Sequence, residues 1–175
     1  MAEEFKSRQD FEEQSRRRVS AFVASVKSSF RYLVDEYGFT SEEPEYLWFG
    51  DLRDALVRMI YRRSPIRIDI DFRPGENLLA VGLHDVTRGW AMDLEELISF
   101  RTQGSLVPVI PPIDSGLSFA EMKRRAARRE QLVSEDLQSV VRELATRLRS
   151  NAADVLNGGT QDLARASATT REPTA

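Results

Sequence analysis

Cysteine is absent from this 175-residue chain, and histidine occurs once, at His84. The lack of cysteine excludes disulfides, thiolate zinc sites and cysteine nucleophiles. A lone histidine would leave carboxylates as nearly all the ligands of a zinc ion, which is unusual for that metal. No run approaches the roughly 20 apolar residues that a membrane helix needs, and the N-terminal segment lacks the apolar core of a signal peptide. We therefore expect a soluble, cytoplasmic protein with no membrane partner.

Motifs of catalysis and phosphate binding are missing as well. The chain has no Walker A loop, no Gly-x-Gly-x-x-Gly fingerprint, no Gly-x-Ser-x-Gly elbow and no His-Glu-x-x-His pair. Charged residues make up 30% of the chain but nearly cancel, for a net charge of -3, which argues against nucleic acid as the main partner. Hydrophobic residues make up 41%, which is enough to form a core. We expect a folded, non-enzymatic protein, and we nominate no catalytic residue, no metal ligand and no cofactor.

The clearest pattern in the chain is an alternation of apolar and charged residues. Ile66, Ile68, Ile70 and Phe72 fall on one face, and Arg67, Asp69, Asp71 and Arg73 fall on the other. Period two indicates a strand with one buried and one wet face. Turn residues follow at 73–77, and the alternation then resumes at Leu79, Val81 and Leu83. The sequence therefore predicts a β-hairpin as the centre of the fold.

The segment at 51–63 fits two structures. Its apolar residues match a helix face with Asp51 as the N-cap, but Val57, Met59 and Tyr61 also alternate with arginines as in a strand. We favour the strand, because a lone hairpin is marginal whereas three strands with an apolar face are stable.

Spacings of three and four predict a helix over about 10–37 that ends at Gly38. A short edge strand is expected at 46–50, and Asp93 is expected to cap a short helix that reaches about Arg101. Prolines and glycines make 103–117 a linker. Ser118 and Glu121 match a capping box, which opens a long helix over 118–157.

The predicted fold is α+β: a small antiparallel sheet of three to four strands, packed by an N-terminal helix, with a long C-terminal helix. Residues 1–102 would form the α+β domain, joined through the linker to the helix at 118–157. Residues 158–175 are rich in alanine, serine and threonine, and we expect a disordered tail there.

Three groups of residues are candidates for a function. The first is an acidic and aromatic surface near the predicted edge strand, with a second aromatic anchor further along. Its members are Glu42, Glu43, Glu45, Tyr46, Trp48 and Trp90. The apolar stripe of the long helix adds Leu137, Val141, Leu144 and Leu148, because a helix of about 58 Å would overhang strands of about 27 Å. We expect these residues to bind a protein partner or a second copy of the chain, as a homo-oligomer or a heteromeric complex.

The second group is a basic stripe, and the third is a set of potential metal ligands. Lys123, Arg124, Arg125, Arg128 and Arg129 form a basic cluster on the long helix, and all but Lys123 share one side of it, so they could grip phosphates. A solvated face or a contact with the acidic segment at 35–54 is the favoured interpretation. Asp69 and Asp71 leave one face of a strand near His84, as the ligands of a metal-dependent enzyme would. Arg67 and Arg73 flank them, so a charge ladder is the favoured interpretation.

The order of motifs from 30 to 101 resembles a known type of protein. Tyr37-Gly38-Phe39 is followed by the strand-like run at 55–83, then by Trp90 and by Asp93-Leu94-Glu95-Glu96-Leu97. This order resembles that of small, uncharacterised bacterial proteins of the toxin-immunity type, in which a helix precedes an antiparallel sheet and a short acidic helix. The resemblance implies a protein-binding role of immunity or adaptor type and transfers no catalytic residue. Nucleic-acid association and a metal-dependent enzyme remain the alternatives.

Overall fold

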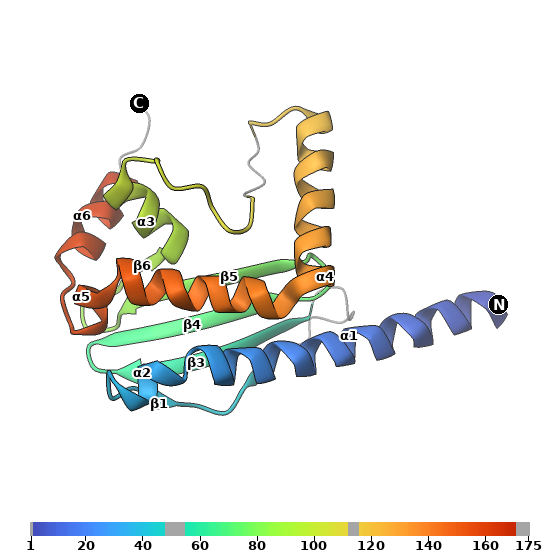
Figure 1. Cartoon of the computed structure of the whole chain (residues 1–175), viewed down its shortest axis with the longest axis horizontal. Coiled ribbons are helices and arrows are strands. Elements are labelled where there is room, and N and C mark those ends of the chain that lie inside the picture. The colour runs from blue at the N-terminus through green and yellow to red at the C-terminus, as the bar shows by residue number, and fades with distance from the viewer. Residues whose placement is uncertain (1, 48–54, 112–115, 171–175) are drawn as a thin grey trace.

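The computed structural model describes residues 2–47, 55–111 and 116–170, and of residues 2–12 and 166–170 it describes the backbone alone. Helices and strands follow in the order α1 (Ala2–Ser29), α2 (Arg31–Asp35), β1 (Thr40–Ser41), β2 (Glu45–Leu47), β3 (Leu56–Arg63), β4 (Ile66–Arg73), β5 (Leu78–Asp85), β6 (Trp90–Asp93), α3 (Leu94–Thr102), α4 (Phe119–Asn151), α5 (Ala153–Leu156) and α6 (Gln161–Thr170). The fold class is α+β, as the sequence predicted (Figure 1).

The strands form one antiparallel sheet in the order β1-β3-β4-β5-β6, and β2 also pairs with β3. The predicted hairpin is β4 and β5, and the ambiguous segment is the strand β3 in its described part, 55–63. The sheet has six strands rather than three to four. The sequence did not reveal β6, because its four residues run directly into the cap of α3 and are too few to show an alternation.

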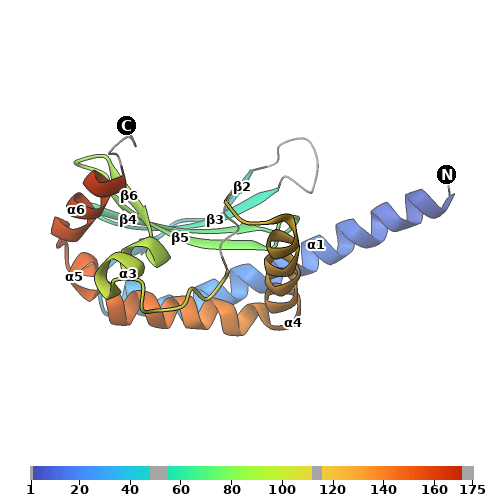
Figure 2. The same cartoon turned by 90° about the horizontal axis from the view of Figure 1, so that it is seen from above.

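The helices α1 and the second half of α4 cover the same face of the sheet, as Figures 1 and 2 show from two sides. Side chains from α1, from α4 and from the sheet meet in one hydrophobic core, which includes Phe22, Val26, Phe30, Ile68, Ile70, Phe72, Val141, Leu144 and Leu148. The even-numbered residues of β4 point into this core, as the alternation predicted. We call this side of the sheet the inner face and the opposite side the outer face.

The predicted N-terminal helix is interrupted near its end. Phe30 leaves the helical conformation, with φ -101 and ψ 9, and separates α1 from α2. The apolar stripe continues through Phe30 and Leu33, both fully buried, so the periodicity alone could not reveal the break. The predicted stop at Gly38 is confirmed by its φ of 69°, a conformation that glycine adopts without strain.

The long helix α4 bends at Asp136, whose φ of -148 and ψ of 50 are not helical. The side chain of Asp136 accepts a hydrogen bond from the N–H of Ser139 at 3.1 Å, so it acts as an N-cap for the second half. The first half of α4, before the bend, points away from the second half and projects past β5 (Figure 1).

This bend corrects the prediction of an overhanging apolar stripe. Leu137, Val141, Leu144 and Leu148 are only 8%, 0%, 3% and 0% exposed within the single chain. The second half of α4 lies flat beside α1 on the inner face, and these side chains fill the core. They are therefore not available as a surface for a partner. The prediction was wrong because it assumed one straight helix where two helical segments meet at a bend.

The C-terminal segment corrects a second expectation. Gly158, with φ 95, ends the helical run as predicted, but α6 then forms where a disordered tail was expected. Leu163 of α6 is fully buried, and Arg101 of α3 pairs with Asp162 of α6 (Nη2 to Oδ2, 2.9 Å) as well as with Asp154 of α5 (Nη2 to Oδ2, 2.6 Å). The composition of the segment did not predict this helix, because its packing depends on one buried leucine and on an arginine that is distant in the sequence.

Candidate functional site

The outer face of the sheet carries a cluster of paired charges. Figure 2 shows that α1 and the second half of α4 lie on the opposite side of the sheet. Residues that face one another across antiparallel strands share a face, so the register defines three rows on the outer face. The rows are Glu45, Arg58, Asp71 and Ala80; then Ile60, Asp69, Gly82 and Asp93; then Arg62, Arg67, His84 and Ala91.

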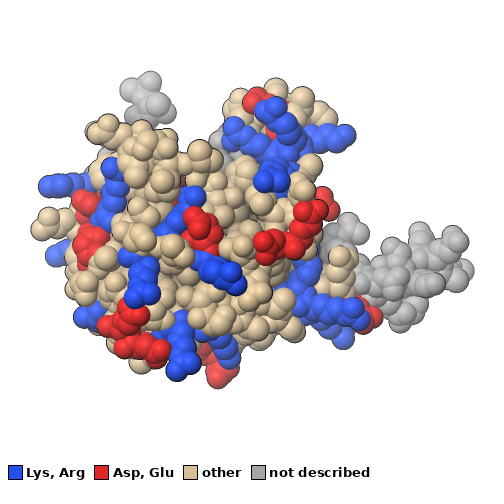
Figure 3. Space-filling model, viewed as in Figure 1, with Lys and Arg blue, Asp and Glu red and all other residues tan. Residues whose placement is uncertain are grey.

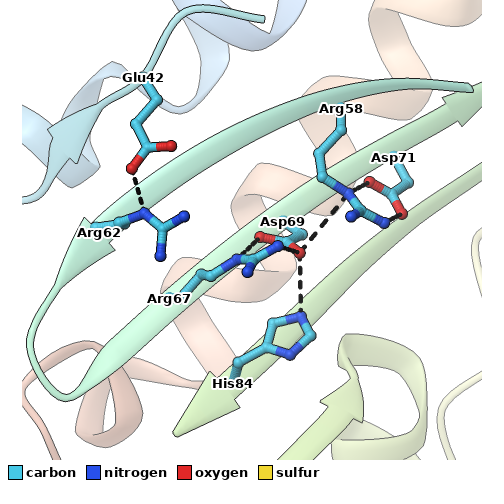
Figure 4. A network of polar contacts seen from close by, with 7 residues as sticks. All are labelled: Glu42, Arg58, Arg62, Arg67, Asp69, Asp71 and His84. Atoms are coloured by element: carbon cyan, nitrogen blue, oxygen red, sulfur yellow. Dashed lines mark hydrogen bonds and ion pairs between the residues drawn. The ribbon is translucent and has the colours of Figure 1, made fainter. Parts of the chain in front are cut away.

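Two arginines hold the two aspartates of β4 in paired contacts (Figure 4). Arg58 binds Asp71 through Nε (2.7 Å) and Nη2 (2.8 Å). Arg67 binds Asp69 through Nε (2.6 Å) and Nη2 (2.5 Å). This bidentate geometry is the strongest form of a guanidinium–carboxylate contact. The hydrogen bonds that Arg58 donates to Asp71 raise the pKa of Arg58, so its guanidinium stays charged at any physiological pH.

Asp69 is the buried centre of this network. Its side chain is 5% exposed, and Oδ2 lies 3.4 Å from Nε2 of His84 and 3.7 Å from Nε of Arg58. Burial alone would raise the pKa of Asp69, but hydrogen bonds from His84 and Arg67 outweigh it and lower the pKa to about 2. A carboxylate with so low a pKa is a poor proton acceptor near neutral pH, so Asp69 is suited to fixing neighbouring groups rather than to base catalysis.

Gly82 makes the contact between His84 and Asp69 possible. A Cβ atom on Gly82 would lie 2.9 Å from Nε2 of His84, too close for an ordinary contact. The absence of a side chain therefore lets the imidazole lie across β5 and reach the carboxylate on β4. The sequence showed the glycine but not this role, since the role depends on the register of two strands.

Asp93 lies on the other side of Gly82 from Asp69, and its pKa is shifted in the opposite direction. It caps α3, where its side chain accepts from the N–H of Glu95 at 2.8 Å within a capping box. Burial raises the pKa of Asp93 to about 6, with a further increase from the charges of Glu96 and Glu95. Together with Asp69 and His84 it lines a hollow of about 350 Å³ on the outer face.

The geometry does not favour the metal-dependent enzyme. The structure does bring Asp69, Asp71 and His84 to one face, as predicted. Arg58 and Arg67 already occupy the carboxylate oxygens, so a metal ion would have to displace both guanidinium groups. Among the described residues, no three histidine, aspartate or glutamate side chains are placed so that they could hold a metal ion.

The acidic and aromatic candidate residues predicted from the sequence do not form one surface but lie in separate parts of the structure. Glu42 pairs with Arg62 at the edge of the outer face, whereas Glu43 and Glu45 are exposed. Tyr46 is 49% exposed on β2. Trp90 lies at the far end of the sheet on β6, half-buried, with the Arg88 guanidinium 5.1 Å from the centre of its ring. Trp48 lies outside the described residues, so the surface that the structure defines is the one at β2.

The basic stripe lies on the projecting first half of α4, where blue side chains gather at the free end of the helix in Figure 3. Lys123, Arg124 and Arg128 are exposed. Arg129 is half-buried and donates from Nη2 to the carbonyl oxygen of Pro111 at 3.0 Å, and burial lowers its pKa. The stripe therefore does not act as one continuous surface.

The sequence also suggested a contact between the basic stripe and the acidic segment at 35–54. The acids of this segment for which the structure describes an ion pair bind other arginines. Glu36 pairs with Arg149 at 2.5 Å, and Asp35 pairs with Arg31 at 2.9 Å. These arginines lie in the second half of α4 and in α2, away from the stripe.

Two residues of the outer face, Arg58 and Asp93, were not predicted as part of a site. Arg58 was missed because the structure of its segment was ambiguous in the sequence. Asp93 was missed because its role as a helix cap already explained it.

None of the described helices is long and apolar enough to cross a membrane. No protein-family model matches the chain, and neither the comparison with curated proteins nor that with solved structures gives a significant match.

Proposed function

We propose that this is a non-enzymatic protein-binding protein of immunity or adaptor type, and that it binds through the surface formed by Glu43, Glu45, Tyr46 and Leu47. We call these residues the β2 surface. The observation that carries the proposal is the exposure of an entire edge strand: all three residues of β2 are exposed, with Tyr46 at 49% and Leu47 at 37%.

The β2 surface combines two properties of protein-binding sites. β2 pairs with β3 on one side, and an exposed edge strand is a template on which another chain can form hydrogen bonds. Tyrosine is enriched among the residues that dominate binding energies. The two glutamates beside Tyr46 favour a partner with a basic surface, because complementary charge speeds association and excludes wrong partners.

A capture experiment with matched variants tests this proposal. The tagged full-length chain is incubated with lysate of its own host, in parallel with Tyr46→Ser/Leu47→Ser and with Val34→Ser. Val34 is a comparably exposed apolar residue, at 41%, on α2. We expect one protein to be retained by the wild type and by Val34→Ser and to be lost from the β2 variant. Retention of the same proteins by all three chains, or by none, would show that the β2 surface is not the binding site.

Association with nucleic acid is a second candidate, supported by the projecting arm of α4. Lys123, Arg124 and Arg128 are exposed there, clear of the body of the protein. Phosphate contacts of this kind weaken steeply with salt. Binding of a mixed-sequence RNA or DNA probe at low salt that is abolished by Lys123→Gln/Arg124→Gln/Arg128→Gln would support it, and the absence of any shift at low salt would exclude it.

A further inference from the structure

The hollow of about 350 Å³ on the outer face has a floor without large side chains. Ala80 and Gly82 of β5 and Ala91 of β6 form this floor, and all three belong to the outer-face rows. A surface of backbone and methyl groups is flat and apolar, so an aliphatic chain or a planar group can lie against it. The volume is at the lower end of the range for sites that bind ligands, roughly 300–1,000 Å³.

The wall of the hollow on the side of β3 and β4 is already neutralised. Arg58 holds Asp71 there through two hydrogen bonds. Asp69 is held in the same way by an arginine of its own strand, Arg67, and His84 lies across Gly82 toward it (Figure 4). These groups are occupied with one another, so this wall offers little net charge to a ligand.

The opposite wall consists of Asp93, at the end of β6, and Glu96, in the first turn of α3. In the described part of the chain, no arginine or lysine forms an ion pair with either of them, although the neighbouring Glu95 pairs with Arg147 at 3.2 Å. The pKa of Asp93 is raised to about 6 by burial and by the charges of Glu96 and Glu95, which reflects the same lack of a nearby cation.

The charges around the hollow therefore do not balance. One arginine and four carboxylates line it, 1 − 4 = −3 with the imidazole taken as neutral. Arg67 lies beside the hollow and cancels the charge of Asp69, which leaves −2. This surplus belongs to Asp93 and Glu96, so the group that complements the hollow is a cation placed on their side of the floor.

A guanidinium group suits this arrangement better than an ammonium group. It is planar, it presents five N–H donors in a fixed fork, and it is the more weakly hydrated of the two cations. It can therefore lie flat on the floor and donate to two carboxylates at once. The methylene groups of an arginine side chain would cover Ala80 and Ala91, as such stems commonly cover apolar surface.

The β2 surface lies close enough for one partner to reach both places. Glu45 of the β2 surface begins the row that continues through Arg58 and Asp71 to Ala80, at the floor of the hollow. Strands are about 4.8 Å apart, so Glu45 and Ala80 are separated by about 14 Å. A standard interface covers about 800 Å² of each partner, which is enough to include both.

We propose that the hollow receives an arginine side chain of the protein that binds the β2 surface, with the guanidinium against Asp93 and Glu96 and the stem over Ala80 and Ala91. This inference rests on the proposed function, because it names the chemistry of the partner for which that function calls. The partner therefore presents a protruding arginine on a basic surface.

An NMR titration of the full-length chain tests the hollow without the partner. The probe is N-acetyl-arginine amide, and the matched control is N-acetyl-citrulline amide, which has nearly the same shape but no charge. At constant ionic strength, the arginine probe should shift the backbone amide signals of Ala80, Gly82 and Ala91. The citrulline compound should leave them unchanged. No shift with the arginine probe, or equal shifts with both compounds, would overturn the proposal.

A first pair of variants tests the charge. Glu96→Gln removes one carboxylate but keeps a residue type suited to the capping box, and it should weaken binding of the arginine probe about threefold or more. Glu135→Gln, on the exposed surface of α4, should bind the probe like the wild type. Equal affinities in all three chains would show that the carboxylate wall does not hold the guanidinium.

A second pair tests the shape of the floor. Ala91→Leu places a large side chain on the floor without changing any charge, and binding of the arginine probe should be lost. Ala126→Leu makes the same substitution on the exposed side of α4 and should have no effect. Thermal unfolding of both variants checks that each is folded, and undiminished binding by a folded Ala91→Leu chain would contradict the proposal.

The hollow and the β2 surface can fail separately. Tyr46→Ser/Leu47→Ser leaves the hollow intact, so it should bind the arginine probe like the wild type even though it loses the captured partner. Capture that depends on the β2 surface, without any binding of the probe, would disprove the hollow alone. Binding of the probe, with capture that does not depend on the β2 surface, would disprove the β2 surface as the binding site.

Discussion

Asp69 and Asp93 lie on either side of Gly82 in one row across the outer face of the sheet, and their pKa values are shifted in opposite directions. Hydrogen bonds from His84 and Arg67 outweigh burial and lower the pKa of Asp69 to about 2, whereas burial and the charges of Glu96 and Glu95 raise that of Asp93 to about 6. One carboxylate stabilises the fold in its charged form and the other in its neutral form. Their contributions to stability should therefore depend on pH with opposite sign.

Asp69→Asn should destabilise the protein in a manner that depends on acidity. A folded-state pKa below the ordinary value of 3.8 adds stability that is present above pH 4 and is lost as the pH falls through about 2. The shift corresponds to about 2 kcal/mol. The difference in free energy of unfolding between wild type and variant, measured by urea titration, should be largest near pH 7 and shrink toward pH 2. Asp35→Asn, which removes an exposed helical ion pair, is the control and should cost at most about 0.5 kcal/mol.

Asp93→Asn should stabilise the protein above pH 6. A raised folded-state pKa means that the contribution of Asp93 is fully present below about pH 4 and is lost as the pH rises through about 6. Asparagine is an equally good N-cap and carries no charge, so the variant should gain about 1–2 kcal/mol at pH 8 and nothing at pH 4. Thermal unfolding at the two pH values provides the measurement. A gain of equal size at both would show that the effect is not electrostatic.

Gly82→Ala should separate His84 from Asp69. The new Cβ would lie 2.9 Å from Nε2 of His84, and the imidazole is the flexible partner, so it should rotate away. The pKa of Asp69 should then rise above about 2, which a carbon-13 NMR titration of the carboxyl group would detect. Gly116→Ala is a matched control, because nothing lies within 4 Å of the added Cβ.

A double variant sharpens this test. In a His84→Ala background, Gly82→Ala should cause no further rise in the pKa of Asp69, since the hydrogen bond is already gone. An additional rise of similar size would mean that the glycine acts on Asp69 by another route.

Leu148→Ala should unfold the protein more easily without changing its oligomeric state. Leu148 is fully buried in the core, and removal of such a side chain costs about 2–5 kcal/mol. Arg142→Ala, on the exposed side of the same helix, should stay within about 0.5 kcal/mol of the wild type. Urea unfolding and light scattering are measured on the same samples. A lower mass with unchanged stability would place Leu148 in an interface after all.

The central hairpin could be predicted because its signal is local. Ile66 to Phe72 alternate without exception, and one face of β4 is buried and the other is charged as a result. The bend at Asp136 and the helix α6 have no such signal. Asp136 caps the second half of α4 only because the sheet and α1 favour a helix lying flat there, and α6 depends on Leu163 meeting the core and on Arg101 reaching it from α3.

The candidate site was visible in the sequence as residue types but not as an arrangement. Asp69 and Asp71 were expected on one face, and they are. Their arginine partners could not be assigned, because Arg58 belongs to a strand whose existence was undecided and Arg67 shares its own strand with Asp69. The opposite pKa shifts of Asp69 and Asp93 follow from the register of β4, β5 and β6, which no local pattern encodes.

The packing of α1 and α2 against α4 has a consequence for how the protein is made. The hydroxyl of Tyr32 donates to the carbonyl of Ala145 at 3.0 Å across a separation of 113 residues, and Phe22, Val26 and Phe30 share their core with Val141 and Leu148. On the ribosome, the sheet can form early and cover part of the apolar side of α1, but the rest of α1 and of the inner face has no cover until the second half of α4 has emerged. Contacts of such long range form late and leave apolar surface open in the meantime. The nascent chain is therefore most exposed to aggregation during synthesis of the stretch between β6 and the bend at Asp136, where a pause in translation would be most harmful.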